Sequence, residues 1–152
     1  MAHLELSFSE PPAPAVEPVD FAVDEPLRSL DRWSVATADA AEPCLVLNEL
    51  LDIVALSPSA ADLLGAADPT DLLGCNLLAG IIRLVDFNQQ PQALPQGEVE
   101  KTPPVLARET GRLARGLLRV QHPGRLITLD AIATPLLDGD TVVGSLTFLA
   151  EI

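Results

Sequence analysis

The feature that most constrains the fold is a run of three long β-strand patterns at the end of the sequence. The ranges 114–121, 126–135 and 141–151 are rich in Val, Ile, Leu and Thr, and short polar segments separate them. Between the last two ranges, the dipeptide Asp138-Gly139 favours the left-handed turn residues of a tight hairpin. The sequence therefore predicts an antiparallel meander, whose apolar side needs a cover from the rest of the chain.

Alternation along these strands predicts which side chains share a face. The apolar positions that we expect to point inward are Ile127, Leu129, Ala131, Ala133, Val142, Gly144, Leu146 and Phe148. The positions that we expect on the outer face are Leu117, Thr128, Ile132, Val143, Thr147 and Leu149.

An earlier part of the sequence predicts a hairpin followed by a short helix. The ranges 45–48 and 52–56 are rich in branched residues and are separated by a few residues that can turn. Ser57 can accept hydrogen bonds from the first amides of a helix that begins at Pro58, and Gly65 can take the left-handed conformation that ends it.

The middle of the sequence gives weaker signals. The range 69–73 predicts a second small helix, and 76–84 is apolar enough to be buried on most sides. The range 85–104 has four prolines and no clear period, which predicts a long loop. A helix is expected at 105–111, and the change from helix to strand falls somewhere within 112–116.

Two segments precede this pattern. Residues 1–26 contain six acidic residues, five prolines and no Lys or Arg, which predicts a disordered acidic, proline-rich tail. Residues 27–41 predict an amphipathic helix, with Leu27, Leu30 and Val35 on one side and Trp33 near the boundary. Its apolar side needs a partner, which is either its own domain or a second subunit.

Composition disfavours several classes of function. A net charge of −13 would repel the phosphates of a nucleic acid. The longest apolar run, 72–82, is well short of the ~20 residues of a membrane helix. The first ten residues carry two glutamates and no basic residue, unlike a secretory signal, so a cytoplasmic location is predicted.

Few residues suit metal binding or catalysis. Cys44 and Cys75 are far apart in sequence, and His3 and His122 are the two histidines. This set forms no zinc-site spacing and places no base beside a nucleophile. We therefore predict no metal and no enzymatic activity.

The order of segments over 42–152 resembles the Per-Arnt-Sim (PAS) sensor domain. PCLVLNELLDIVALSPSAADLLG at 43–65 resembles the opening hairpin and first helix of that family, DLLG at 71–74 the segment that follows, and TLDAIATPLLDGDTVVGSLTFLAEI at 128–152 the closing hairpin. The resemblance implies an α+β fold, in which a five-stranded antiparallel sheet carries short helices on one face. The amphipathic helix that the spacing predicts at 27–41 precedes it. It also implies a sensing or partner-binding module without catalysis.

Cys75 lies in the order Gly74, Cys75, Asn76 and Leu77. In the flavin-binding light-oxygen-voltage (LOV) branch of the family, the reactive cysteine follows the asparagine, and that place is taken here by Leu77. A shift of two positions turns a side chain by about 200° around a helix. We therefore expect Cys75 to be a core residue rather than a photochemical one.

Flavin and haem are both disfavoured as cofactors. The positions that match the flavin-contacting amides of the LOV branch are Val120, Leu129 and Leu146, and all three are apolar. Haem-binding relatives usually supply a histidine from the linking helix, and 105–111 contains none. If a ligand pocket exists, we expect an apolar lining.

The resemblance and the alternation pattern together give two sets of candidate site residues. The expected pocket lining is Val120, Ile127, Leu129, Leu146 and Phe148. The expected dimer interface is Leu27, Leu30, Trp33, Leu117, Ile132, Val143 and Leu149.

Arginines concentrate in one stretch of this acidic chain. They are Arg108, Arg112, Arg115, Arg119 and Arg125. One interpretation is a solvated face paired with nearby carboxylates such as Glu109, and the other is a docking patch for an acidic protein partner or the acidic tail.

Two functions follow from these observations. The sequence ends with the last strand, so we expect any signal to leave through contact with another chain. The first hypothesis is a stand-alone regulatory module that associates with proteins, as a homodimer that regulates a partner in trans. The second is a sensor whose apolar pocket binds a small molecule.

Overall fold

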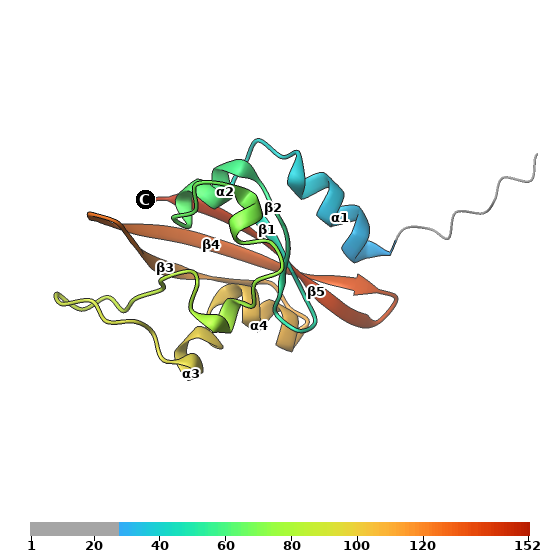
Figure 1. Cartoon of the computed structure of the whole chain (residues 1–152). Helices are drawn as coiled ribbons and strands as arrows, with labels where there is room; N and C mark the ends of the chain where they lie inside the picture. Colours follow the sequence, from blue (N-terminus) through green and yellow to red (C-terminus); the bar gives the residue numbers. More distant parts are fainter. Residues whose placement is uncertain (1–27) are drawn as a thin grey trace, which may run out of the picture.

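The computed structural model describes residues 28–152, and its centre is one antiparallel sheet (Figure 1). The predicted tail at 1–26 and Leu27 lie outside the described residues. The sheet has the strand order β2-β1-β5-β4-β3. Its strands are β1 (Cys44–Asn48), β2 (Ile53–Leu56), β3 (Ala114–His122), β4 (Arg125–Asp138) and β5 (Thr141–Glu151). The predicted fold class and both predicted hairpins are confirmed.

The helices of the inner layer are short. They are α2 (Pro58–Leu63), the 3₁₀ helices η1 (Pro69–Asp71) and η2 (Leu77–Ala79), α3 (Gln96–Val99) and α4 (Pro103–Thr110). The Ser57 hydroxyl accepts the Ala60 N–H at 3.2 Å, as predicted for the start of α2. Gly111 adopts φ +66° and ends α4, which places the change to β3 between Gly111 and Ala114. α3 lies inside the predicted loop at 85–104, because four residues are too few to show a helical period.

The inner core fills the space between the sheet and these helices. β1 contributes Leu45 and Leu47, α4 contributes Val105, and η2 contributes Leu77. The side chains from β3 and β4 that complete this layer are Leu118, Val120, Ile127, Leu129 and Ala131. This is the apolar face that the alternation of β4 predicts.

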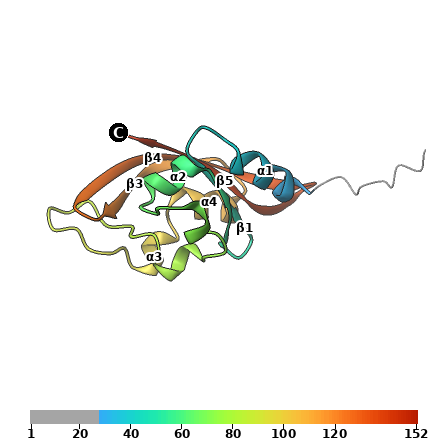
Figure 2. The same cartoon turned by 45° about the horizontal axis from the view of Figure 1, so that its top comes forward.

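A separate helix, α1 (Ser29–Ala38), lies on the opposite face of the sheet. Figures 1 and 2 show it apart from α2, α3 and α4. The outer side chains that pack together beneath it are Cys44, Val46, Ala55, Leu136 and Leu146, and Leu30 packs against them. The Ser29 N–H donates to Asp138 Oδ1 at 2.9 Å, which ties the start of α1 to the β4–β5 hairpin. The partner of α1 in this molecule is therefore its own sheet.

The face assignment of β5 was wrong. Leu146 lies in the outer cluster and Phe148 is 45% exposed, whereas Leu149 lies in the inner core. The Ser145 hydroxyl points inward and donates to the Pro104 carbonyl of α4 at 2.8 Å. Both faces of β5 carry large apolar residues because α1 covers part of the outer face, so alternation alone does not show which face is inner.

A bulge also interrupts the alternation of β5. Leu136 pairs with Gly144 and Leu137 with Val142, which leaves Val143 as an extra residue. Val143 consequently packs on the outer side, against the cluster beneath α1. Bulges of this kind carry no clear sequence signal here.

Loops pair with both edge strands of the sheet. The Ile53 N–H of β2 donates to the Cys75 carbonyl at 2.9 Å, and the Gly74 N–H returns a bond to the Ile53 carbonyl at 2.7 Å. Beside β3, the Val85 N–H donates to the Arg119 carbonyl and the Gln121 N–H donates to the Arg83 carbonyl, both at 2.9 Å.

Within residues 28–152, no helix is long and apolar enough to cross a membrane.

Candidate functional site

The five predicted pocket residues do not lie together. Val120, Ile127 and Leu129 are buried in the inner core, at 0–2% exposure. Leu146 and Phe148 lie on the other face of the sheet, where they border a cleft beside Trp33. The inward side chains of β5 at this level are instead Ser145 and Thr147, so the expected apolar contact at Leu146 was wrong.

A cavity borders the inner core on the side of β3. Its volume is about 370 Å³, and it lies between η2, the loop that follows η2, and α3. The apolar residues shared by its wall and the inner core are Leu77, Ile82, Leu84 and Val99, and its polar lining comes from Arg83, Gln96 and Gln121. An apolar wall with a few polar groups suits a small organic ligand. Sequence reasoning missed this cavity because one part of its wall comes from the predicted loop at 85–104, whose path was not predicted.

Thr147 is an unusual member of the inner layer. Its side chain is fully buried, and its hydroxyl has no hydrogen-bond partner among the described residues. It lies between Leu45 of β1 and Ala133 of β4. A buried hydroxyl without a partner costs about 1 to 3 kcal/mol, and Thr147 is not among the residues that line the cavity on the side of β3.

An apolar strip remains exposed on the outer side of the molecule, formed by one residue of α1 and by the part of the sheet that α1 leaves uncovered. We name Trp33, Leu117, Ile132 and Phe148 the outer strip. Trp33, Phe148 and Leu117 are 44%, 45% and 52% exposed, and Ile132 is half-buried. The pairing of β4 with β5 places Ile132 beside Phe148. An exposed group with two aromatic rings is typical of a surface that binds another protein.

The other predicted interface residues behave differently. Leu30 and Val143 are half-buried against the cluster beneath α1, so they serve the packing of α1 on its own sheet. Leu149 is 4% exposed and belongs to the inner core. Its expected place on the outer face was wrong, for the reason given for β5.

Arg115 and Arg119 share the outer face of β3 but have different partners. Arg115 donates to both oxygens of Asp130, through Nε at 3.1 Å and Nη2 at 2.6 Å. This pairing lowers the pKa of Asp130 and raises that of Arg115. Arg119 Nη1 donates to the carbonyls of Asp86 and Asn88, at 3.3 and 2.9 Å. Sequence spacing alone does not reveal these long-range contacts.

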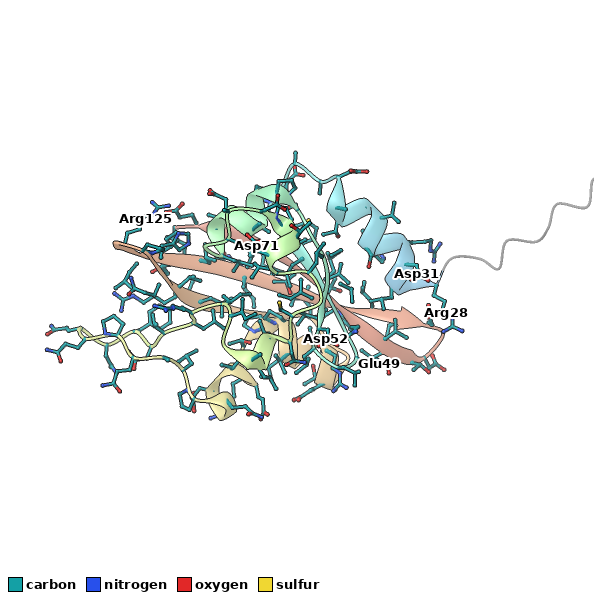
Figure 3. The ribbon with its side chains drawn as sticks, in the orientation of Figure 1. Arg28, Asp31, Glu49, Asp52, Asp71 and Arg125 are labelled. Carbon is teal, nitrogen blue, oxygen red and sulfur yellow. The ribbon has the colours of Figure 1, made fainter. Side chains whose placement is uncertain are left out.

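The remaining arginines lie elsewhere. Arg108 is on α4 and Arg112 is in the segment between α4 and β3. Arg125 begins β4 at the opposite end of the sheet from Arg28, as Figure 3 shows, and its Nη1 lies 3.8 Å from Glu151 Oε1. The arginines therefore do not form one patch.

The Gly74-Cys75-Asn76 stretch lies between η1 and η2 and pairs with the start of β2. Asn76 Nδ2 donates to the Leu50 carbonyl at 2.7 Å and to Asp52 Oδ1 at 2.9 Å, and Asn76 Oδ1 accepts the Leu78 N–H at 3.0 Å. Cys75 is half-buried outside the core clusters, with Sγ 3.6 Å from the Asp71 carbonyl oxygen. The expectation that Cys75 is a core residue was therefore wrong, because its side chain is half-buried and belongs to neither core cluster.

Cys44 is the deeply buried thiol. It is 2% exposed in the cluster beneath α1. Burial raises the pKa of the Cys44 thiol, and a hydrogen bond with the Ser57 side chain opposes this increase. The thiol is thus held in its neutral, unreactive form.

The His122 side chain serves a structural contact. His122 Nε2 lies 2.6 Å from the Leu63 carbonyl oxygen, so the ring connects the end of β3 with the end of α2. Figure 3 shows Arg28 and Asp31 at the start of α1, near Glu49 of the β1–β2 turn. Across residues 28–152, no group of three His, Cys, Asp or Glu side chains is arranged to hold a metal ion.

Comparisons with known proteins identify the fold. No protein-family model matches the sequence, and no curated protein matches it. Solved structures do match: VqmA of Vibrio cholerae, described as a dimer without its target DNA, has a TM-score of 0.59 at 17% identity over 81% of this chain and 51% of that chain. The chain thus spans about half the length of that VqmA chain.

Two further structures agree. A PAS domain from Colwellia psychrerythraea has a TM-score of 0.55 at 15% identity, and covers 81% of this chain and 96% of that domain. The LOV protein of Rhodobacter sphaeroides has a TM-score of 0.55 at 15% identity, over 82% of this chain and 66% of that one. The chain therefore has a PAS fold, as the resemblance in the sequence implies.

Proposed function

We propose that the protein is a cytoplasmic PAS-type signalling module that acts by association, as a homodimer that regulates a partner protein in trans. The observation that carries the proposal is the outer strip. Leu117, Ile132 and Phe148 lie on the sheet face that α1 leaves partly uncovered, and Trp33 lies on α1 beside Phe148. Burying them would remove apolar surface from water, which is the main driving force of association.

A two-fold dimer suits this surface. In such a dimer, the same patch of each copy meets its counterpart, so the outer strip would pack against itself. The proposed interface buries at least the ~1,200 Å² typical of specific complexes. VqmA, which shares the fold, is described as a dimer, and this gives the proposal a precedent.

Sedimentation velocity at micromolar concentration tests the proposal. The wild-type protein is expected to sediment as a dimer, and Ile132→Asp as a folded monomer, because burying the new carboxylate against apolar side chains of the second copy costs more than an exposed ion pair with Arg115, its neighbour on β3, returns. Val35→Asp is the matched control. Val35 is 64% exposed and lies two positions from Trp33, which turns it about 200° away around α1. A monomeric wild-type protein would contradict the homodimer.

A second candidate function is a small-molecule sensor. The cavity of about 370 Å³ beside the inner core, with its apolar wall and few polar groups, favours it. VqmA is described as bound to DPO, so a protein of this fold takes a small ligand. Native mass spectrometry of the purified protein tests this function: additional bound mass supports the sensor, and a bare chain supports association alone.

Several expectations from the sequence remain predictions within this proposal. Flavin stays disfavoured because Leu77 occupies the reactive position of the LOV branch, and haem because α4 carries no histidine. An absorbance spectrum of the purified protein tests both. We also propose that the module binds no nucleic acid or membrane and performs no catalysis, and the overall charge of −13 supports the first point.

A further inference from the structure

The Arg83 side chain lies between two cavities. One is the cavity of about 370 Å³ beside the inner core, and the other, of about 520 Å³, lies at the turn between β3 and β4. Arg83 and Gln121 line both of them. Arg83 is exposed, whereas its neighbours Ile82 and Leu84 are each 6% exposed and belong to the wall of the first cavity. The Arg83 side chain therefore lies at the mouth of an apolar cavity, next to solvent.

The charge around these cavities is unusual for this chain. The sequence has 22 Asp and Glu residues against nine Lys and Arg, yet no Asp or Glu of residues 28–152 lines either cavity. Arg83 is the one Lys or Arg residue in both linings, and no salt bridge holds it in the part of the chain that the structure describes. The mouth of the cavity is thus cationic and complements an anion.

The two glutamines of the lining already have acceptors for their amide groups. Gln121 Nε2 donates to the carbonyls of the two residues that flank the β3–β4 turn, at 2.7 and 3.2 Å. Gln96 Nε2 lies 3.4 Å from Glu100 Oε1, which competes for its N–H groups. The amide oxygens of both glutamines accept hydrogen bonds and cannot donate to an anion. Arg83 is therefore the main donor that an anionic ligand would meet.

Main-chain pairing fixes the position of Arg83. The Arg83 carbonyl accepts the Gln121 N–H of β3 at 2.9 Å. On the other side of the same segment, the Leu94 N–H donates to the Leu84 carbonyl at 2.9 Å. The backbone that carries the guanidinium group is therefore held on both sides, which lowers the entropy cost of binding a ligand there.

The wall behind Arg83 is apolar. Its residues that belong to the inner core or pack against it are Leu77, Leu78, Ile82, Leu84, Leu94 and Val99. Hydrocarbon that moves from water to such a wall gains free energy with every methylene that is buried. A volume of about 370 Å³ lies within the roughly 300 to 1,000 Å³ of small-molecule sites. The cavity thus suits a hydrocarbon group, and its mouth suits a negative charge at the end of that group.

We propose that this cavity binds an amphiphilic carboxylic acid, with its hydrocarbon tail against the apolar wall and its carboxylate hydrogen-bonded to Arg83. The inference rests on the second candidate function, the small-molecule sensor, and names the class of its ligand. A carboxylate can accept two parallel N–H bonds from one guanidinium group, which gives the charged end of the ligand a fixed direction. The site uses no residue of the outer strip, so it is separate from the proposed dimer surface.

Octanoate is the probe, at concentrations below micelle formation. Octanol and octylammonium are its controls, because they have the same chain length and a neutral or a cationic end. Octanoate should bind about tenfold more tightly than octanol, and octylammonium should bind more weakly than either. The preference is diagnostic because a purely apolar cavity would favour octanol, whose end group costs less to remove from water. Octanol that binds as tightly as octanoate would overturn the proposal.

The place of binding is followed by NMR of the full chain with ¹³C-labelled methyl groups of Leu, Val and Ile. Octanoate is expected to shift the methyl signals of Leu77, Ile82 and Val99 in the cavity wall. The methyl signals of Val46 and Leu146 beneath α1 should not change. Shifts confined to the cluster beneath α1 would overturn the proposal.

A change in the protein tests the charged contact. Arg83→Gln removes the charge at an exposed position, so the fold should persist, and octanoate binding should weaken about tenfold while octanol binding is unchanged. Arg112→Gln is the matched control, because Arg112 is also exposed but lines neither cavity. An equal loss in the two variants would assign the effect to net charge and overturn the contact with Arg83.

Failure of this inference differs from failure of the proposed functions. If octanol or octylammonium shifts the methyl signals of the cavity wall and octanoate does not, the ligand class is wrong and the cavity is still a small-molecule site. If none of the three shifts them, the inference is overturned, and native mass spectrometry of the purified protein still tests the sensor. Sedimentation uses no ligand, so it tests the homodimer independently.

Discussion

At the scale of the residue, Gly144 shows how closely β5 approaches its neighbours. A Cβ at this position would clash with the Leu47 carbonyl oxygen of β1 and would lie 3.0 Å from Leu30 Cδ1 of α1. Neither β1, which is paired with β5, nor α1, which packs on it, can move away easily. We therefore expect Gly144→Ala to lower the free energy of unfolding by ~1 to 3 kcal/mol, measured by urea denaturation.

Gly97 of α3 is the matched control for Gly144. Nothing lies within 4 Å of a Cβ built there. Gly97→Ala should be neutral or should raise the free energy of unfolding by up to ~1 kcal/mol, because it restricts the unfolded chain. Similar destabilisation by the two substitutions would show that close packing at Gly144 is not the cause.

The two cysteines should differ in reactivity. In the native protein, an aromatic disulfide reagent is expected to label the half-buried Cys75 and leave the buried Cys44 unmodified. The folded state keeps the Cys44 thiol protonated, so its contribution to stability is complete below its unfolded pKa. That contribution is lost as the pH rises above this value. If Cys75→Ala is still labelled quickly, Cys44 is the reactive thiol and the predicted difference between the two cysteines is wrong.

At the scale of the element, α1 depends on a contact from outside its own sequence. Arg28 precedes α1 and provides no capping side chain, and Asp138 Oδ1 accepts the Ser29 N–H instead. Asp138→Ala should therefore cost about 1 kcal/mol in urea denaturation. Asp138→Asn should retain most of the stability because it keeps an acceptor, and Asp140→Ala in the same turn is the control. Equal effects of Asp138→Ala and Asp140→Ala would assign the loss to the turn rather than to α1.

Local signals predicted the elements well, and long-range contacts limited the rest. The Ser57 cap and the Asp138-Gly139 turn were recognisable because capping and turn chemistry act over a few residues. The inner side of β5 was not, because α1 packs on the outer face and both sides of the strand are therefore apolar. The contact of Arg119 with the carbonyls of Asp86 and Asn88 spans more than thirty positions, beyond any sequence period.

The candidate site shows the same difference between local sequence signals and long-range contacts. Ile127 and Leu129 were placed correctly in the inner layer because β4 alternates cleanly, and Val120 of β3 lies in the same layer, paired with Ile127. The cavity beside α3 depends in part on the loop at 85–104, whose path no local pattern defines. Main-chain pairing between Arg83 to Val85 and β3 fixes that path.

At the scale of the whole molecule, the two faces of the sheet should respond differently to the same substitution. Phe148 and Leu149 are neighbours on β5, yet Phe148 is 45% exposed in the outer strip and Leu149 is 4% exposed in the inner core. Leu149→Asp would bury a carboxylate without a partner between the sheet and the helices, so we expect it to unfold the protein. Phe148→Asp would place its carboxylate in solvent in the monomer, so the fold should persist.

The proposed dimer gives a specific expectation for Phe148→Asp. Phe148→Asp should remain folded by circular dichroism and sediment as a monomer, because the charge would meet apolar side chains of the second copy. Trp33 is the sole tryptophan and is 44% exposed in the monomer, so it reports the association. Its emission should shift to shorter wavelength as the wild-type concentration rises through the dimer range, and should be independent of concentration in Phe148→Asp. A folded Phe148→Asp dimer would place the contact elsewhere, and an unfolded one would show that the outer strip is needed within the monomer.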